Sequence, residues 1–152
     1  MKTHTGYLFV TTIAVSAALL AGFAAGRSMD DRKYYPGTNP GLPFSAAVLA
    51  DDTLYLAGTI GLTPGTRAVP DDPKQEARNA LDTIKARLEA AGMSMDDLVV
   101  VQVFCSDVKF YNDFNEVYKT YFEKDFPARA FIGAGTLLFH ARFEVQGTAV
   151  RR

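Results

Sequence analysis

Two segments with a helical repeat, separated by one apolar run, restrict this chain to a small number of folds. Between Asp72 and Gly92, apolar residues recur at three- and four-residue spacing, with Pro73 suited to the first turn and Gly92 to the end. Residues 110–124 form a second such segment with an aromatic inner stripe. Residues 98–106 between them are nearly all apolar, which predicts a central strand covered on both faces. The polar face of the first helix is predicted to be solvated and carries Lys74, Arg78, Lys85, Arg87 and Glu89.

Four further apolar runs predict strands. Two of them, 45–50 and 53–60, are joined by an acidic pair that is typical of a hairpin, and the others are 128–134 and 141–149. The resulting order, ββ-α-β-α-ββ, predicts an α+β domain in which two helices lie on one face of a mixed sheet. The opposite face of such a sheet needs cover, which a symmetric oligomer would supply.

The N-terminal segment differs in composition from the rest. Residues 1–26 contain one charged side chain, Lys2, and are otherwise mostly apolar and small, as in a signal peptide or a signal anchor. Small residues at its end favour cleavage, but about 20 uncharged residues are also enough to span a bilayer. Both alternatives predict export to the periplasm or the medium, with membrane attachment only if the segment is retained. Residues 27–43 are predicted to be a linker and a loop that leads into the domain at 44–152.

The charge and the rare reactive residues exclude several functions. The formal charge is −1, so the chain has no field to attract a nucleic acid, and we expect no such partner. The single cysteine, Cys105, lies in an apolar run, which predicts a buried thiol. His140 has no nearby Cys, His or carboxylate at a metal-ligand spacing, so no metal site is predicted.

One pair of charged residues stands out. Arg129 and Glu144 each lie in an apolar, strand-like run. A guanidinium presents a planar fork of donors that fits a carboxylate, and a glutamate can move protons to and from water. If the two runs face one another, the pair would hydrolyse a small substrate that bears a carboxylate. The alternative is an ion pair that only ties two strands together.

From residue 40 to residue 149, a stretch that includes Arg129 and Glu144, the chain resembles the RidA (YjgF-type) family of imine and enamine deaminases. The likeness is most specific at the C-terminal end, where the arginine box and the closing glutamate strand have the family spacing. The matching segments are LPFSAAV (42–48), LAGTIG (56–61), FNEVYKTYF (114–122), PARA (127–130) and FEVQGTA (143–149).

The resemblance implies a chorismate-mutase-like fold and a homotrimer with clefts between subunits. It implies hydrolysis of 2-imino acids or enamines to 2-oxo acids and ammonia, with no metal or organic cofactor. Arg129 would grip the substrate carboxylate and Glu144 would activate water. Gly58 and the main chain at Phe131 would line the cleft, with Asn115 close by, although a surface or capping role suits this asparagine equally well.

Three residues depart from the family pattern. Phe44 stands where many members have tyrosine, Ala57 replaces a small polar residue, and Phe131 replaces a smaller side chain. All three make the expected cleft more apolar. A second function therefore stays open beside catalysis, namely a trimer that binds small carboxylates without turning them over.

Overall fold

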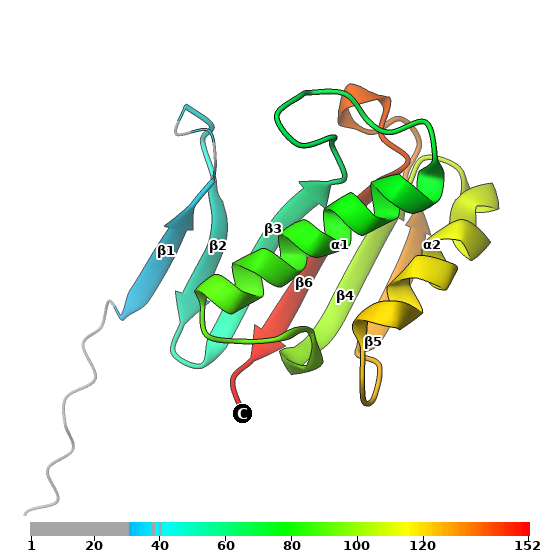
Figure 1. The fold of residues 1–152 in the computed structure, drawn as a ribbon. Coiled ribbons are helices and arrows are strands. Elements are labelled where there is room, and N and C mark those ends of the chain that lie inside the picture. Colours follow the sequence, from blue (N-terminus) through cyan, green and yellow to red (C-terminus); the bar gives the residue numbers. More distant parts are fainter. Residues whose placement is uncertain (1–30, 38, 40) are drawn as a thin grey trace, which may run out of the picture.

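The computed structural model describes residues 31–37, 39 and 41–152, which form one mixed sheet and two α-helices (Figure 1). The strands are β1 (Arg32–Pro36), β2 (Ser45–Ala50), β3 (Thr53–Ile60), β4 (Leu98–Cys105), β5 (Ala128–Gly133) and β6 (Phe143–Val150). The helices are α1 (Pro73–Ala90) and α2 (Tyr111–Tyr118). Short 3₁₀ turns lie at Met95–Asp97, Val108–Phe110, Lys119–Tyr121 and Leu138–His140.

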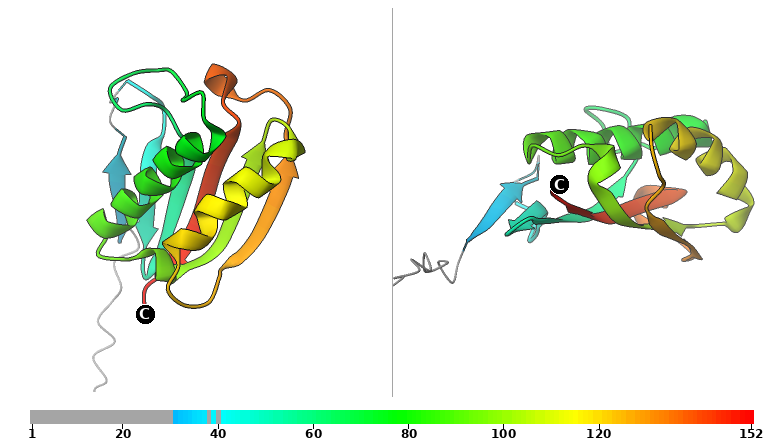
Figure 2. Two further views of the ribbon diagram at one scale, coloured as in Figure 1. Left: turned by 45° about the vertical axis from the view of Figure 1, so that its right-hand side comes forward. Right: turned by 90° about the horizontal axis from the view of Figure 1, so that it is seen from below.

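The sheet has the strand order β1-β2-β3-β6-β4-β5. All neighbouring strands are antiparallel except β4 and β5, which are parallel and are connected through α2. Both helices pack on the same face of the sheet (Figure 2). The predicted α+β architecture, with two helices on one face of a mixed sheet, is confirmed.

The predicted start and end of α1 are also confirmed. Asp72 caps the helix by accepting a hydrogen bond from the backbone N of Lys74 at 2.9 Å, and Pro73 occupies the first turn. Gly92 follows the helix at a φ of 73°, where a residue without Cβ is favoured. The apolar stripe is buried against the sheet and consists of Ala77, Ala80, Leu81, Ile84 and Leu88.

The second helix is shorter than the predicted range of 110–124. The α-helical part ends at Tyr118, and 3₁₀ turns extend it on both sides. The Thr120 hydroxyl donates to the carbonyl of Val117 at 2.7 Å, and Phe122 is extended, so the last turn tightens and stops. The aromatic stripe still packs inward, since Phe114 and Tyr118 are buried.

Strand β1 lies within residues 27–43, which were expected to be linker and loop, so that prediction is wrong for the residues of this strand. β1 pairs antiparallel with β2 and satisfies the hydrogen-bonding groups along that edge. The predicted signal segment, 1–26, lies outside the described residues. Among the residues that the structure does describe, no helix is long and apolar enough to cross a membrane.

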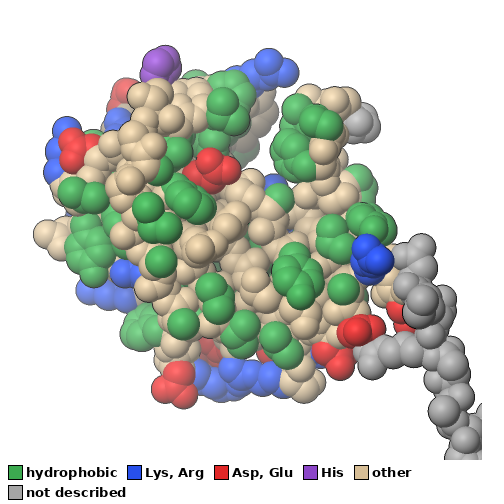
Figure 3. Space-filling view, turned by 180° about the vertical axis from the view of Figure 1, so that it is seen from behind, with side chains coloured by type: hydrophobic (Ala, Val, Ile, Leu, Met, Phe, Trp, Pro, Cys, Tyr) green, Lys and Arg blue, Asp and Glu red, His purple; other side chains and the backbone are tan. Residues whose placement is uncertain are grey.

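The sheet face away from the helices is open, so within one chain the central strand is covered on one side only, and the second cover expected from an oligomer stays a prediction. In β4, Val101, Val103 and Cys105 are buried beneath the helices, whereas Val100 on the opposite face is 43% exposed. Hydrophobic side chains are spread over the open face, and most of the charged side chains in view lie at its margins (Figure 3).

Candidate functional site

Glu144 lies on the open face of the sheet. It is opposite Ile60 of β3 and Phe104 of β4, and its neighbours Phe143 and Val145 are buried on the helix side. Because side chains alternate along a strand, the Glu144 carboxylate points away from the helices. It is half-buried and, among the described residues, pairs with no cation.

A bulge in β3 makes room for this carboxylate. The register between β3 and β6 shifts between Leu56 and Thr59, so Ala57 and Gly58 lie outside the regular ladder. A Cβ added at Gly58 would collide with Oε1 of Glu144. The carboxylate therefore rests directly against the Cα of Gly58, and a larger residue at this position would displace it.

A buried carboxylate fixes the start of β6. Glu76, in the first turn of α1, is fully buried and accepts hydrogen bonds from the backbone N of Arg142 at 2.6 Å and of Phe143 at 3.0 Å. Its other oxygen accepts from Nη1 of Arg142 at 2.8 Å. These contacts hold the chain immediately before Glu144, and the sequence analysis did not identify them.

Arg129 lies on the helix side of the edge strand β5. It is opposite Val101, whose side chain is buried beneath the helices. Its Nη2 donates to Oδ1 of Asn115 at 2.7 Å, and its guanidinium carbon lies 4.5 Å from the ring centre of Tyr118. Asn115 Oδ1 is its only hydrogen-bond acceptor within the described part of the chain, so most of its N–H donors are uncommitted.

Aromatic rings hold Arg129 in place. Phe131 packs edge-on against Tyr111 and Phe114, with ring centres 5.0 Å and 5.7 Å apart. Burial raises the pKa of Tyr118 to about 12, and the nearby Arg129 opposes part of that shift. Tyr118 therefore stays neutral and presents a ring face to the guanidinium, an arrangement that favours a cation.

The predicted pair does not converge within one chain. β4 lies between β5 and β6, and the two side chains project from opposite faces of the sheet. From the register, Arg129 and Glu144 are three residue steps and two strand spacings apart, which places their Cα atoms roughly 14 Å apart. The expectation that the two runs face one another is wrong for a single copy, and no ion pair joins the two within the described chain.

Five of the six predicted site residues thus fall into two groups. Glu144 and Gly58 lie together on the open face, and Arg129, Asn115 and Phe131 lie together beside α2. The sixth, Phe44, comes one residue before β2 and is 54% exposed.

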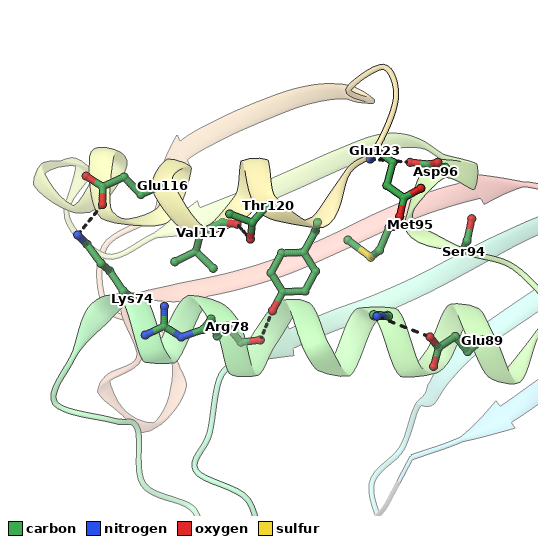
Figure 4. Close-up of a pocket in the computed structure, with 12 residues that line it drawn as sticks. Lys74, Arg78, Glu89, Ser94, Met95, Asp96, Glu116, Val117, Thr120 and Glu123 are labelled. Carbon is green, nitrogen blue, oxygen red and sulfur yellow. Dashed lines mark hydrogen bonds and ion pairs between the residues drawn. The ribbon is translucent and has the colours of Figure 1, made fainter.

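A groove of about 590 Å³ between the two helices contains none of these residues (Figure 4). Its walls carry charges that pair with one another, as Lys74 does with Glu116 at 2.6 Å. Tyr121 crosses the groove and donates to Asp82 at 2.7 Å. Because these charges compensate one another, the groove is a poor candidate for the site.

The other reactive groups take no part in the site. Cys105 is buried as predicted, and burial raises the pKa of its thiol, so it is a poor nucleophile. In the described ranges, no group of His, Cys, Asp and Glu side chains could hold a metal ion.

Comparison with known proteins identifies the family. The family model described as Endoribonuclease L-PSP matches residues 38–151. The chain belongs to this family, also called YjgF/RidA. Relatives of this RidA-family chain include the RutC family protein UK114 of Drosophila melanogaster, 38% identical over 73% of this chain and 81% of that protein. The human 2-iminobutanoate/2-iminopropanoate deaminase is 36% identical over 72% of this chain and 80% of that enzyme.

A solved structure supports the same assignment. The crystal structure of E. coli TdcF with bound serine superimposes with a TM-score of 0.71 at 30% identity, over 78% of this chain and 94% of that chain. The α+β fold described above is therefore the fold of the RidA family.

Proposed function

We propose that this protein hydrolyses reactive 2-imino acids or enamines to 2-oxo acids and ammonia. The observation that carries the proposal is the Glu144 carboxylate, which is held against Gly58 on an open sheet face and has no cation partner among the described residues. Such a carboxylate is placed to take a proton from water rather than to stabilise the fold. The relatives named as 2-iminobutanoate/2-iminopropanoate deaminases support the reaction class.

The site is completed by a second copy of the chain. Arg129 lies at the sheet edge on the helix side, and Glu144 lies on the open face, so two different surfaces must meet. A head-to-tail contact between two different surfaces of identical chains closes into a ring where the rotation between copies allows it. A cyclic trimer fits this requirement, and it would cover the apolar side chains of the open face.

In the proposed reaction, the fork of Arg129 holds the substrate carboxylate. Water attacks the C=N carbon while Glu144 accepts its proton and passes it to nitrogen, which gives a tetrahedral adduct with a hydroxyl and an amine. Glu144 then takes the hydroxyl proton and delivers it to the amine nitrogen as the C–N bond breaks, so that ammonia leaves and the carbonyl of the 2-oxo acid forms. An imine carbon is already electrophilic, so these groups suffice for the chemistry.

Two other functions are weaker. The family description names an endoribonuclease, but a formal charge of −1 offers little attraction for a polyanion. A trimer that binds carboxylates without turnover remains the main alternative, because Phe44 and Phe131 make the site more apolar.

A coupled assay of 2-iminobutanoate hydrolysis separates these functions. We expect wild-type turnover well above that of Arg129→Met and Glu144→Gln variants. Wild-type turnover equal to that of both variants, together with Arg129-dependent binding of 2-oxobutanoate, would instead establish the non-catalytic trimer. Salt-sensitive cleavage of RNA would favour the nuclease.

Arg129→Met should weaken substrate binding more than it slows the chemical step. A charge-assisted contact contributes about 1.5–3 kcal/mol, so we expect KM to rise about 10- to 150-fold. Steady-state kinetics measure this, with Arg78→Met on the exposed face of α1 as the control. An unchanged KM in Arg129→Met would show that the substrate carboxylate binds elsewhere.

Gly58→Ala tests the fit between glycine and carboxylate. The new methyl group would displace Oε1 of Glu144, which is the end of a flexible side chain, so the fold should survive. Misplacing a catalytic group by about 1 Å can cost about 100-fold, and we expect a loss of that order in kcat/KM. The control is Gly37→Ala, since nothing described lies within 4 Å of a Cβ there. Equal activity in both variants would contradict the proposed placement of the carboxylate.

A further inference from the structure

Arg87 contacts the Gly58 bulge from the helix side. The sequence places this residue on the solvated face of α1, but the structure corrects that prediction, because Arg87 is half-buried and reaches β3. Its Nη1 donates to the carbonyl of Ala57 at 3.1 Å and to the hydroxyl of Thr59 at 2.5 Å. Burial lowers the pKa of Arg87, as expected for a desolvated guanidinium.

These groups form a closed hydrogen-bond set. Thr59 is buried, and its hydroxyl donates to the carbonyl of Ala57 at 3.0 Å while it accepts from Arg87. Nη1 carries two hydrogens and so can serve both oxygens at once. The Ala57 carbonyl therefore receives two hydrogen bonds, and the one from Arg87 comes from α1.

The direction of this carbonyl sets the direction of the next amide. No cis peptide bond occurs among the described residues, and in a trans peptide the C=O and the following N–H point in opposite directions. With the Ala57 carbonyl held toward α1, the N–H of Gly58 is directed toward the open face. Glu144 rests against Gly58 on that same face.

We propose that Arg87 is a positioning residue that fixes the Ala57–Gly58 peptide, so that the Gly58 N–H is presented beside Glu144. The catalytic part of this inference rests on the proposed deaminase function. As water gives its proton to Glu144, its oxygen gains hydroxide character, and a fixed N–H beside it stabilises that charge. Without Arg87, Thr59 is the one side-chain donor to the Ala57 carbonyl that remains among the described residues, so the peptide is freer to rotate.

The test compares Arg87→Met, which keeps the long apolar stem, with Arg87→Lys, which keeps a charge and a donor. One fixed donor of this kind can contribute about 100-fold to kcat, so we expect kcat to fall about 10- to 100-fold in Arg87→Met with KM nearly unchanged. Arg87→Lys should recover part of the loss. The matched control is Lys85→Met, two residues away on α1, whose side chain forms a single, long ion pair within the described residues, with Glu89 at 4.0 Å. Arg87→Met kinetics equal to those of Lys85→Met would overturn the proposal.

A second measurement does not depend on turnover. Crystal structures of the wild type and of Arg87→Met should show the Ala57 carbonyl toward α1 in the former, and a rotated or doubly oriented Ala57–Gly58 peptide in the latter. The same peptide orientation in both proteins would overturn the proposal even if activity fell. If the peptide is rotated in Arg87→Met but the wild type has no deaminase activity, the result would support the positioning role of Arg87 and reject the proposed function. Thr59→Val, which removes the other partner, should shift the peptide in the same direction without removing a charge.

Discussion

Glu144→Gln is expected to lower kcat by about 100- to 10,000-fold, the usual contribution of a general acid–base group. An amide has the shape of the carboxylate and should rest against Gly58 in the same way, but it cannot accept the proton of the attacking water. Because the Glu144 carboxylate has no cation partner in the described chain, its replacement should break no ion pair and should leave the melting temperature nearly unchanged.

The measurement is the rate of 2-iminobutanoate hydrolysis, with Glu89→Gln on the exposed face of α1 as the control. Binding of 2-oxobutanoate should be retained in Glu144→Gln, because Arg129 is the residue proposed to hold the carboxylate. Near-normal turnover in this variant would exclude Glu144 as the proton carrier. Loss of binding together with turnover would show that Glu144 positions the ligand instead.

The parts of the fold that local signals determine were predictable. Asp72, Pro73 and Gly92 mark the ends of α1 because capping, a fixed φ and a positive φ are properties of single residues. Strand β1 could not be found in this way. Its residues are held in place by non-local pairing with β2, and no repeat inside such a short segment indicates that partner.

The candidate site shows the same limit. Two charged residues in apolar runs, supported by the family spacing, made Arg129 and Glu144 candidates, but their arrangement depends on β4 lying between β5 and β6, which is a non-local fact. Once the register is known, the alternation of side chains places the two residues on opposite faces. Arg87 was assigned to solvent because the helical repeat separates polar from apolar positions but does not show which polar positions reach the neighbouring strand.

Glu76→Leu is expected to destabilise the protein by about 3–5 kcal/mol, the usual cost of removing one partner of a buried ion pair. The substitution leaves two backbone N–H groups, at Arg142 and Phe143, and one guanidinium without their acceptor. A glutamate that is fully buried is uncommon unless it is paired, and these three donors explain its presence. For a domain of this size the loss should lower Tm by roughly 10–20 °C.

Chemical denaturation and thermal melting measure this effect, and Glu89→Leu on the exposed part of α1 should change stability by less than about 0.5 kcal/mol. The variants Glu76→Leu and Arg142→Leu should be less destabilising together than the sum of the two, because each alone removes the charge partner of the other. Additive losses would show that the two residues act independently.

The same contacts hold the backbone directly before Glu144, so a destabilised Glu76→Leu protein that still folds at low temperature should also lose turnover. Full activity under those conditions would show that the Glu76 contacts are not needed to place the Glu144 carboxylate.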